Sequence, residues 1–356
     1  MARVFVSVLI DTYNHERFIE EAVSSVLAQD FPAADREIIV VDDGSTDRTS
    51  EQLRRFAAEV RVLRKANGGQ ASAFNAGIPE CRGELVAFLD GDDWWAPQKL
   101  SRVVQAVSAD PSVGIVGHGI INVQRDGVEL VETLREACRF QAGTSMEGAL
   151  LFRRRGAFLG TSRMAIRAEL LRRIGPVPEE IQIQADEYLF TLASALTATL
   201  ILPEALTFYR MHAENLFQLD SYDDQKLRRK QKSLAALVQT ILRRLEEFGT
   251  EPRVRNALTA YTRASADQLR LALDGGWPWE TAKTEWQLYR VVHPDARPSH
   301  RVFKFLVLFA ALFVSPRFYY HAQRNLAHSG FYQRARNRWL GVPEMKHIQK
   351  HWREHP

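Results

Sequence analysis

The sequence predicts an α/β fold: a mixed, mainly parallel sheet flanked by helices, followed by a helical C-terminal region. Over the first 120 residues, short β-branched apolar runs alternate with helical apolar spacing, which is typical of β-α units. A polar motif directly follows three of these runs. After residue 220 three segments have helical apolar spacing and no strand-like run interrupts them, so a helical appendage is expected there.

The first two β-α units are expected within residues 4–57. Val4 to Ile10 is a compact apolar run, and in residues 16–29 the apolar side chains fall on one helical face. Ile38 to Val41 is the second strand. The helix after it extends to about residue 57, and its candidate N-caps are Ser45, Thr46 and Asp47.

The next two strands lead to an acidic cluster. Arg61 to Leu63 is joined through Gly68-Gly69 to a helix over Ala71 to Ile78, and Leu85 to Leu89 is the fourth strand. The fourth strand ends directly at the sequence DGDD, residues 90–93.

Three polar motifs, residues 11–14, 42–47 and 90–93, follow predicted strands. Ligands of parallel sheets bind outside the carboxyl ends of the strands, so these motifs are expected to converge on one edge. An Asp-rich turn alone is commonly a solvated loop. The convergence with two further motifs favours a binding site instead.

Three carboxylates within four positions repel one another and need a positive partner. Neither the glycine spacing of a dinucleotide site nor that of a P-loop is present, so a glycine cradle for phosphate is not expected. Mg²⁺ or Mn²⁺ prefers oxygen ligands and can bridge carboxylates to a diphosphate. The spacing Asp-x-Asp of Asp90 and Asp92 lets both side chains approach a metal and the ribose of a nucleotide.

Four ordered stretches carry a family resemblance: VSVLIDTYN, VVDDGSTD, NGGQASAFNAGI and FLDGDDWWAP. Together they resemble the nucleotide-sugar-binding half of the family 2 glycosyltransferases, which have the Rossmann-like GT-A fold, over roughly residues 4–217. The resemblance implies a nucleotide diphosphate sugar donor. The residues that it assigns to the donor are Asp11, Thr12, Tyr13, Asn14, Asp43, Gly69, Asn75, Asp90 and Arg210.

The resemblance also implies a divalent metal, Mn²⁺ or Mg²⁺, held by Asp90, Asp92 and, in the stretch YRMHAENL, His212. A lone histidine is more often an ordinary polar residue than a ligand, and in this stretch the two interpretations of His212 stay open. Asp93 is expected to be an outer or capping carboxylate. The chain departs from the family at Asp11, where the first motif usually has a proline, and this leaves the identity of the base open.

The stretch QADEYLF resembles the family's Glu-Asp motif, in which the aspartate is the general base of inverting members. Asp186 is therefore the expected base, with Ala185 in place of the usual Glu and Glu187 as the second candidate. An acceptor hydroxyl must lose its proton as it attacks the anomeric carbon, which is a task for a carboxylate. The structural alternative is that both acids merely begin a helix over 189–196. Residues 160–162, Gly160, Thr161 and Ser162, are expected to form the wall on the acceptor side.

The expected activity is that of a metal-dependent inverting hexosyltransferase that moves sugar from a nucleotide diphosphate donor to a glycan or lipid-linked acceptor in cell-surface polysaccharide assembly. The alternative is a catalytically idle sugar-nucleotide-binding or scaffold protein with the same fold. Asp90, Asp92 and Asp186 favour the enzyme. The sugar, the acceptor and the nucleotide stay open, because loops without a transferable code recognise them.

The expected domains are a catalytic domain, residues 1–220, and a helical region, residues 221–356. The segments with helical spacing in the second are 225–248, 253–274 and 279–291. The apolar segment 302–314 is shorter than the ~20 residues that span a bilayer. Interfacial contact of 302–320 with an anionic membrane surface is favoured over an internal core or a homo-oligomer contact. The side chains expected to take part are Phe303, Leu306, Phe309, Phe313, Arg317, Arg324, Arg334, Arg336 and Arg338.

Composition places the chain in a reducing compartment. Cys81 and Cys138 are the two cysteines, which argues against a disulfide framework. The N-terminal stretch resembles a first buried strand more than a signal peptide. The net charge is +4, while residues 317–356 have eight basic residues and two Glu, so the tail is basic. No nucleic-acid-binding signature accompanies it. The expected location is the cytoplasm, with a peripheral position on the cytoplasmic face of the membrane as the extension of that expectation.

Overall fold

A computed structural model describes residues 4–123, 127, 129–212, 223–292 and 296–327. The chain divides into two compact units, Met1–Leu219 with Thr240–Leu258, and Asp220–Gln239 with Thr259–Pro356. Helix α8 (Asp224–Glu247), which the sequence assigned whole to the C-terminal region, contributes residues to both units.

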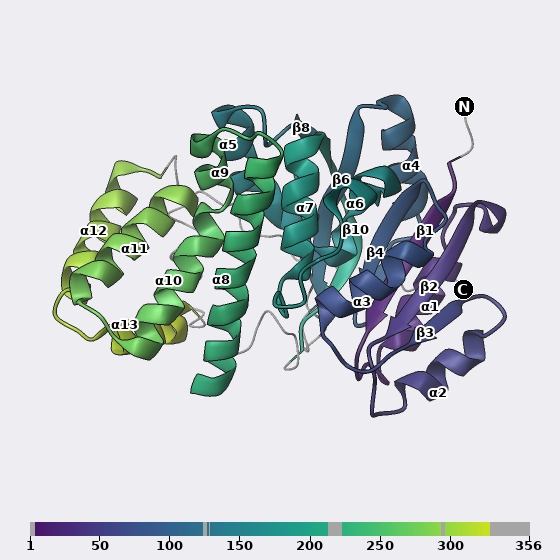
Figure 1. The fold of residues 1–356 in the computed structure, drawn as a ribbon, viewed down its shortest axis with the longest axis horizontal. Coiled ribbons are helices and arrows are strands. Elements are labelled where there is room, and N and C mark those ends of the chain that lie inside the picture. The colour runs from purple at the N-terminus through teal and green to yellow at the C-terminus, as the bar shows by residue number, and fades with distance from the viewer. Residues whose placement is uncertain (1–3, 124–126, 128, 213–222, 293–295, 328–356) are drawn as a thin grey trace. The chain divides into compact units, whose positions relative to one another are not determined.

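The first unit is built on one sheet (Figure 1). In the described residues this sheet has ten strands, in the order β3-β2-β1-β4-β9-β6-β10-β5, with β7 on β6 and β8 on β10. The strands are β1 (Val6–Thr12), β2 (Arg36–Asp42), β3 (Arg61–Arg64), β4 (Leu85–Asp90), β5 (Trp94–Trp95), β6 (Val113–Val123), β7 (Glu129–Glu132), β8 (Cys138–Phe140), β9 (Ala165–Arg167) and β10 (Ala198–Arg210).

The longest ladders of the sheet are parallel, namely β1 with β2, β1 with β4, and β6 with β10. Strand β9 lies between β4 and β6 and is antiparallel to both. The predicted fold class, a mixed and mainly parallel sheet flanked by helices, is therefore confirmed. The predicted strands all exist, with ends shifted by at most two residues.

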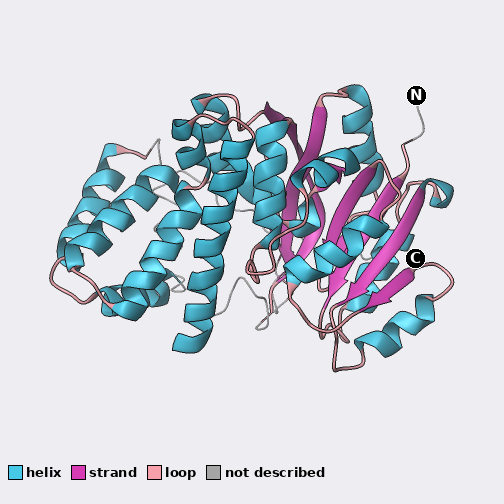
Figure 2. Ribbon diagram, viewed as in Figure 1, coloured by secondary structure: helices cyan, strands magenta, loops and turns pink. Residues whose placement is uncertain are grey.

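Helices lie on both faces of this sheet (Figure 2). Those of the first unit are α1 (Ile19–Leu27), α2 (Thr49–Leu53), α3 (Gln70–Gly77), α4 (Lys99–Ala109), α5 (Met146–Arg155), α6 (Ala168–Ile174), α7 (Ala185–Leu196) and α9 (Pro252–Leu258). Successive side chains of a strand point to opposite faces, so Val8 and Ile10 of β1 pack with α1 and α4. Leu9 points the other way, toward α3, where a Cβ on Gly77 would lie 2.3 Å from its Cδ1. Both faces of β1 are thus buried by helices, which explains why its residues are mainly apolar.

The second unit is helical. Its helices, besides the first part of α8, are α10 (Ala260–Asp274), α11 (Pro278–Val292), α12 (Pro298–Ala311) and α13 (Pro316–Ala327). A buried cluster formed by Leu227, Leu234, Ala266 and Leu269 joins α8 to α10. The predicted appendage is therefore helical in its described part. No described helix of the chain has the combined length and apolarity needed to cross a membrane.

Two segments with predicted helical structure are divided in the structure. The segment with helical spacing over 253–274 contains two helices, α9 and α10, with Thr259 between them. The helix expected to follow a cap within residues 45–47 and to extend to about residue 57 begins at Thr49 and ends at Leu53, and a 3-10 turn, Arg54–Phe56, follows it. Asp47 instead accepts hydrogen bonds from the amide and hydroxyl of Thr49.

Candidate functional site

The three polar motifs meet at the carboxyl edge of the sheet. In the parallel register, Asp11 of β1 lies opposite Asp90 of β4, and Thr12 lies opposite Asp42 of β2. Asp43 follows Asp42, and its amide donates to the Thr12 carbonyl oxygen at 2.9 Å. The predicted convergence is therefore confirmed, and it follows directly from parallel pairing of neighbouring strands.

Asp11 and Asp90 form the acidic centre of this edge. Burial, followed by the charge of Asp92, raises the pKa of Asp11 to about 8. Burial, followed by the charge of Asp11, raises the pKa of Asp90 well above its usual range. Asp11 Oδ1 is shielded from solvent and has no hydrogen-bond partner among the described residues. An additional positive charge or donor is therefore favoured at this position.

Asp92 has a different environment. Burial opposes its ionisation, but hydrogen bonding to His212 and the charges of His15 and His212 lower its pKa below the usual value. His212 Nε2 lies 2.9 Å and His15 Nε2 3.8 Å from Asp92 Oδ2. Asp92 therefore ionises more readily than Asp11 and Asp90, and His212 lies beside it.

Gly91 brings the acidic loop against the end of β1. A Cβ on Gly91 would lie 2.6 Å from Thr12 Oγ1 and 2.9 Å from His15 Nδ1. These two atoms are themselves 3.1 Å apart. No side chain fits between the two aspartates without displacing these neighbours, which explains the glycine in DGDD.

Asp186 lies in the first turn of α7, after Gln184, which has a left-handed φ of 61°. Its Oδ2 accepts from the amide and the hydroxyl of Thr161, at 3.1 and 3.2 Å, and its Oδ1 accepts from the Glu187 amide at 2.9 Å. Burial raises the pKa of Asp186, and these donors act in the opposite direction. Asp186 is therefore both a residue of the helix N-terminus and an oriented carboxylate with increased basicity.

Gln70 connects the acidic centre with Asp186. Its Nε2 donates to Asp90 Oδ1 at 3.3 Å and to Thr161 Oγ1 at 3.2 Å. Its Oε1 accepts from the Ala185 amide at 3.2 Å. Asp90 and the predicted base, Asp186, thus belong to one hydrogen-bonded network.

Several residues expected to bind the donor hold the loops of this edge. The Asp43 carboxylate accepts from the Gly69 amide at 2.7 Å and from Lys65 Nζ at 2.7 Å. Gly69 has a φ of 84°, which suits a glycine at the start of α3. Asn14 accepts from the Thr46 amide at 2.8 Å.

Asn75 and Tyr13 have contrasting environments. The Asn75 amide group donates to and accepts from the Val177 backbone, at 2.7 and 2.8 Å, so in this structure it serves the packing of the chain. The Tyr13 side chain is 43% exposed beside the acidic edge. Its ring is available to a flat ligand.

Arg210 ends β10 next to the acidic loop. Its amide donates to Asp93 Oδ1 at 3.0 Å and its Nε to the Asp92 carbonyl oxygen at 3.0 Å. Its guanidinium lies 4.4 Å from the centre of the Trp94 ring and pairs with Glu21. Arg210 therefore stabilises the DGDD loop through hydrogen bonds to the Asp93 carboxylate and the Asp92 carbonyl oxygen.

The sequence analysis missed four residues of the site: His15, Lys65, Gln70 and Lys99. Gln70 lies within the NGGQ stretch that carried the resemblance, and Lys65 precedes it. These were the available signals. Lys99 is separated in sequence from its partner Ser162, and nothing in the sequence points to that contact.

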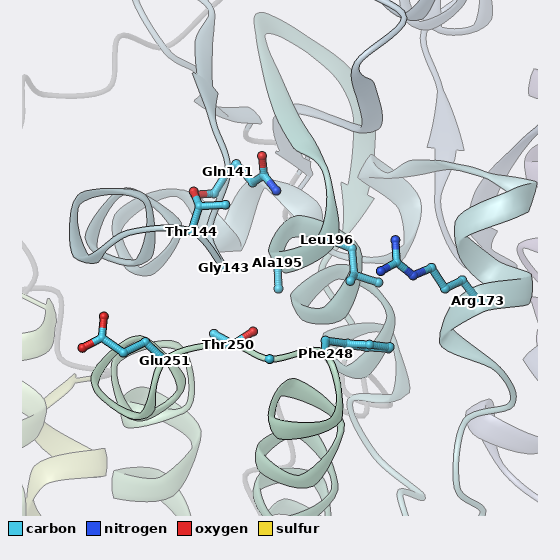
Figure 3. Close-up of a pocket in the computed structure, with 10 residues that line it drawn as sticks. Gln141, Gly143, Thr144, Arg173, Ala195, Leu196, Phe248, Thr250 and Glu251 are labelled. Carbon is cyan, nitrogen blue, oxygen red and sulfur yellow. The ribbon is translucent and has the colours of Figure 1, made fainter.

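A separate hollow of about 450 Å³ lies elsewhere in the first unit (Figure 3). Ala195 and Leu196 line it at the C-terminal end of α7, together with Phe248 and Thr250. Asp186, at the other end of α7, is about 14 Å away along the helix axis at 1.5 Å per residue. The charged side chains that line the hollow are Arg173 and Glu251, so it lacks the carboxylate pair of the sheet edge.

The acidic edge fits Mg²⁺ or Mn²⁺ as a partner of a bound diphosphate. No three His, Cys, Asp or Glu side chains in the described part of the chain are grouped to hold a metal by themselves. Mg²⁺ commonly keeps several waters and takes one or two carboxylates with substrate phosphates. Asp90, Asp92 and the unpartnered Oδ1 of Asp11 supply oxygen donors of that kind.

Comparison with known proteins supports a family assignment. The model of glycosyl transferase family 2 matches residues 7–175. An uncharacterized glycosyltransferase of Nostoc sp. is 36% identical over 218 residues, which cover 59% of this chain and 66% of that protein. The uncharacterized glycosyltransferase EpsJ of Bacillus subtilis is 32% identical over 60% of this chain and 63% of its own length. The chain therefore spans less than two thirds of the length of these relatives.

Solved structures show the same fold. S. aureus TarS 1-349 in complex with UDP-GlcNAc has a TM-score of 0.56 and 19% identity, over 81% of each chain. The mannosyltransferase PcManGT from Pyrobaculum calidifontis, in complex with GDP-Man and Mn²⁺, has a TM-score of 0.52 and 21% identity, over 96% of this chain and 85% of that one. The expected GT-A fold class is confirmed. By its sheet, its relatives and the family model, the region 7–175 of this chain belongs to the family 2 glycosyltransferases.

Proposed function

We propose that the protein is a metal-dependent, inverting glycosyltransferase that takes its sugar from a nucleotide diphosphate donor. One observation carries this proposal: Asp90 and Asp186 belong to one network, through Gln70 and Thr161, at the carboxyl edge of the sheet. A binding protein without chemistry needs the carboxylates of the donor side. It has no need for a second, buried carboxylate that three donors orient.

In this proposal Asp186 removes the proton of the acceptor hydroxyl. As that oxygen forms its bond to the anomeric carbon, the bond from the anomeric carbon to the diphosphate oxygen breaks, and attack from the opposite side inverts the configuration. The raised pKa of Asp186 makes it a stronger base than an exposed carboxylate, while the two Thr161 donors keep its charged form oriented. Mn²⁺ or Mg²⁺, bound between the diphosphate and Asp90, Asp92 and His212, would neutralise the leaving group.

Asp11, Thr12, Tyr13, Asn14, Asp43, Gly69, Asn75 and Arg210 would complete the donor side of this site, either by touching the donor or by holding the loops that do. Two solved neighbours contain UDP-GlcNAc and GDP-Man. A hexosyl donor is therefore the first class to test here. The acceptor class is a glycan or a lipid-linked sugar, in keeping with a role in cell-surface polysaccharide assembly.

The test is release of nucleoside diphosphate from a panel of UDP-, GDP- and dTDP-hexoses, with Mn²⁺, Mg²⁺ or EDTA. Slow hydrolysis of one donor that requires the metal and is absent in Asp186→Asn supports the enzyme. If one nucleotide sugar binds but is not turned over with any acceptor fraction, the protein is the idle sugar-nucleotide-binding protein instead.

We also propose that α12 docks on the surface of an anionic membrane. On this helix and the residues after it, Phe305, Leu306, Phe309 and Phe313 are 54–75% exposed, whereas Phe303 is partly covered. The sequence from Pro298 to Ala327 has four Arg or Lys and no carboxylate, and two of these cations pair with acids of other helices, Lys304 with Glu285 and Arg317 with Asp224. Cations at an apolar face are typical of helices that lie in a bilayer interface. Of the arginines expected to contribute, Arg334, Arg336 and Arg338 lie outside the described residues, and the side chain of Arg324 is not described either.

The test of this docking is co-sedimentation with vesicles of increasing anionic content. We expect the protein to pellet at low salt and to be released at high salt, because the attraction is screened within about 8 Å at physiological ionic strength. Phe309→Asp should reduce the pelleted fraction, and Met146→Asp, at a 41% exposed position of α5, should not. If the protein stays in the supernatant but elutes as a dimer, and Phe309→Asp makes it monomeric, the face is an oligomer contact.

A further inference from the structure

Three donors converge on one backbone oxygen, that of Ser162. Thr207 Oγ1 donates to it at 2.6 Å, Lys99 Nζ at 2.8 Å and Trp95 Nε1 at 3.0 Å. They come from β10, α4 and β5, which are separate elements of the first unit. A carbonyl oxygen has two lone pairs, so three donors exceed its ordinary complement. This anchor, defined here as Thr207, Lys99 and Trp95, fixes the backbone of the turn 160–162 from three elements.

Lys99 makes this anchor unusual. Its side chain is fully buried, and its Nζ lies 3.6 Å from the centre of the Trp95 ring. Burying an ammonium group disfavours its charge, and this lowers the pKa of Lys99 well below its usual range, against the pull of Asp93. A lysine in such a place is uncommon unless its hydrogen bond matters to the protein.

The anchored turn touches both carboxylates of the proposed reaction. Ser162 Oγ accepts from the Asp90 amide at 3.1 Å and lies 3.3 Å from Asp90 Oδ2. The preceding residue, Thr161, donates both its amide and its hydroxyl to Asp186 Oδ2. Thr161 and Ser162 thus orient one carboxylate on α7 and one on β4. The anchor holds these two residues through the Ser162 carbonyl oxygen.

We propose that Lys99 is a positioning residue: through the Ser162 carbonyl oxygen it holds the turn 160–162 so that Asp186 faces the donor bound at Asp90. This inference rests on the proposed function. It extends the expected role of residues 160–162 from a wall beside the acceptor to a device that sets the relative orientation of the two carboxylates. Among the described residues Lys99 Nζ donates to the Ser162 carbonyl oxygen and not to Asp186, so its effect on the base passes through Ser162.

The test uses three variants of the full chain. Lys99→Met keeps most of the side-chain volume and removes the Nζ donor. Thr207→Val removes the hydroxyl at similar volume, and Thr207→Ser retains it. For each variant we would measure the melting temperature, the affinity for nucleoside diphosphate with Mn²⁺, kcat, KM for the donor, and hydrogen exchange of the backbone in residues 158–164.

We expect Lys99→Met and Thr207→Val to lower kcat by about 10-fold or more, because a misplaced base loses reactivity steeply. The donor affinity and KM should change by less than about three-fold, and Thr207→Ser should restore kcat. Hydrogen exchange should accelerate within 158–164 in the first two variants.

A purely structural role would instead lower the melting temperature with kcat unchanged in the folded fraction. That result, or unchanged exchange in 158–164, overturns the inference and leaves the proposed function standing. If the proposed function itself is wrong, the result is different, because the parent protein would then turn over no nucleotide sugar.

Discussion

Replacing Asp11 by Asn should stabilise the metal-free protein, and more so as the pH rises. The pKa of Asp11 is raised from 3.8 to about 8, so between these values the folded state holds a proton that the unfolded state has lost. Stability therefore falls as the pH rises through this window, and the penalty is complete above about pH 8. The gap between the two pKa values corresponds to an upper limit of about 6 kcal/mol.

Asn keeps the burial of a polar group at this site, so we expect a net gain of about 2 kcal/mol at pH 8.5 and a small one near pH 4. A gain of this size raises the melting temperature of a unit of about 200 residues by about 4 to 8 °C. The assay is thermal unfolding in EDTA at several pH values, with Asp30→Asn, an exposed carboxylate, as the control. A melting difference that is negative at pH 8.5, or independent of pH, would refute the electrostatic account of the acidic centre.

Two further predictions concern the chemistry and the loop. Asp186→Asn should keep nucleotide affinity within a few-fold, while turnover falls by roughly 10² or more. Near-normal turnover in this variant would show that another residue is the base, with Glu187 the first candidate. NMR of the fresh product of the parent enzyme should show inverted anomeric configuration. Gly91→Ala should destabilise the protein by about 1 to 3 kcal/mol and weaken metal-dependent nucleotide binding, because its Cβ would lie 2.6 Å from Thr12 Oγ1. Gly156→Ala, whose nearest neighbour would be at 3.6 Å, is the matched control, and equal effects of the two substitutions would contradict this reading.

The part of the fold that the sequence predicts is local. Parallel strands buried on both faces are mainly apolar runs, so β1, β2 and β4 could be recognised without any tertiary information. Parallel pairing then brings Asp11 to Asp90 as a consequence of topology. The helix expected over 189–196, with Asp186 and Glu187 at its start, is α7, which begins at Ala185.

The remaining features depend on contacts between distant residues. Strand β9 has three residues, too few for a periodic pattern, and its position between β4 and β6 is a tertiary result. The break at Thr259 has no Pro or Gly to announce it. The capture of the Asp43 carboxylate by the Gly68 and Gly69 amides, and of Lys99 by Ser162, likewise appears only once the elements have packed.

The central claim is that Asp90 and Asp92 bind a donor diphosphate through a divalent metal. Calorimetric titration of UDP, GDP and dTDP into the parent protein and into Asp92→Asn, each with Mn²⁺, Mg²⁺ or EDTA, tests it most directly. The account predicts that one nucleotide binds the parent protein with metal and fails to bind in EDTA, and that Asp92→Asn abolishes the metal-dependent binding. The same affinity in the parent protein and in Asp92→Asn, with metal and with EDTA alike, would contradict it.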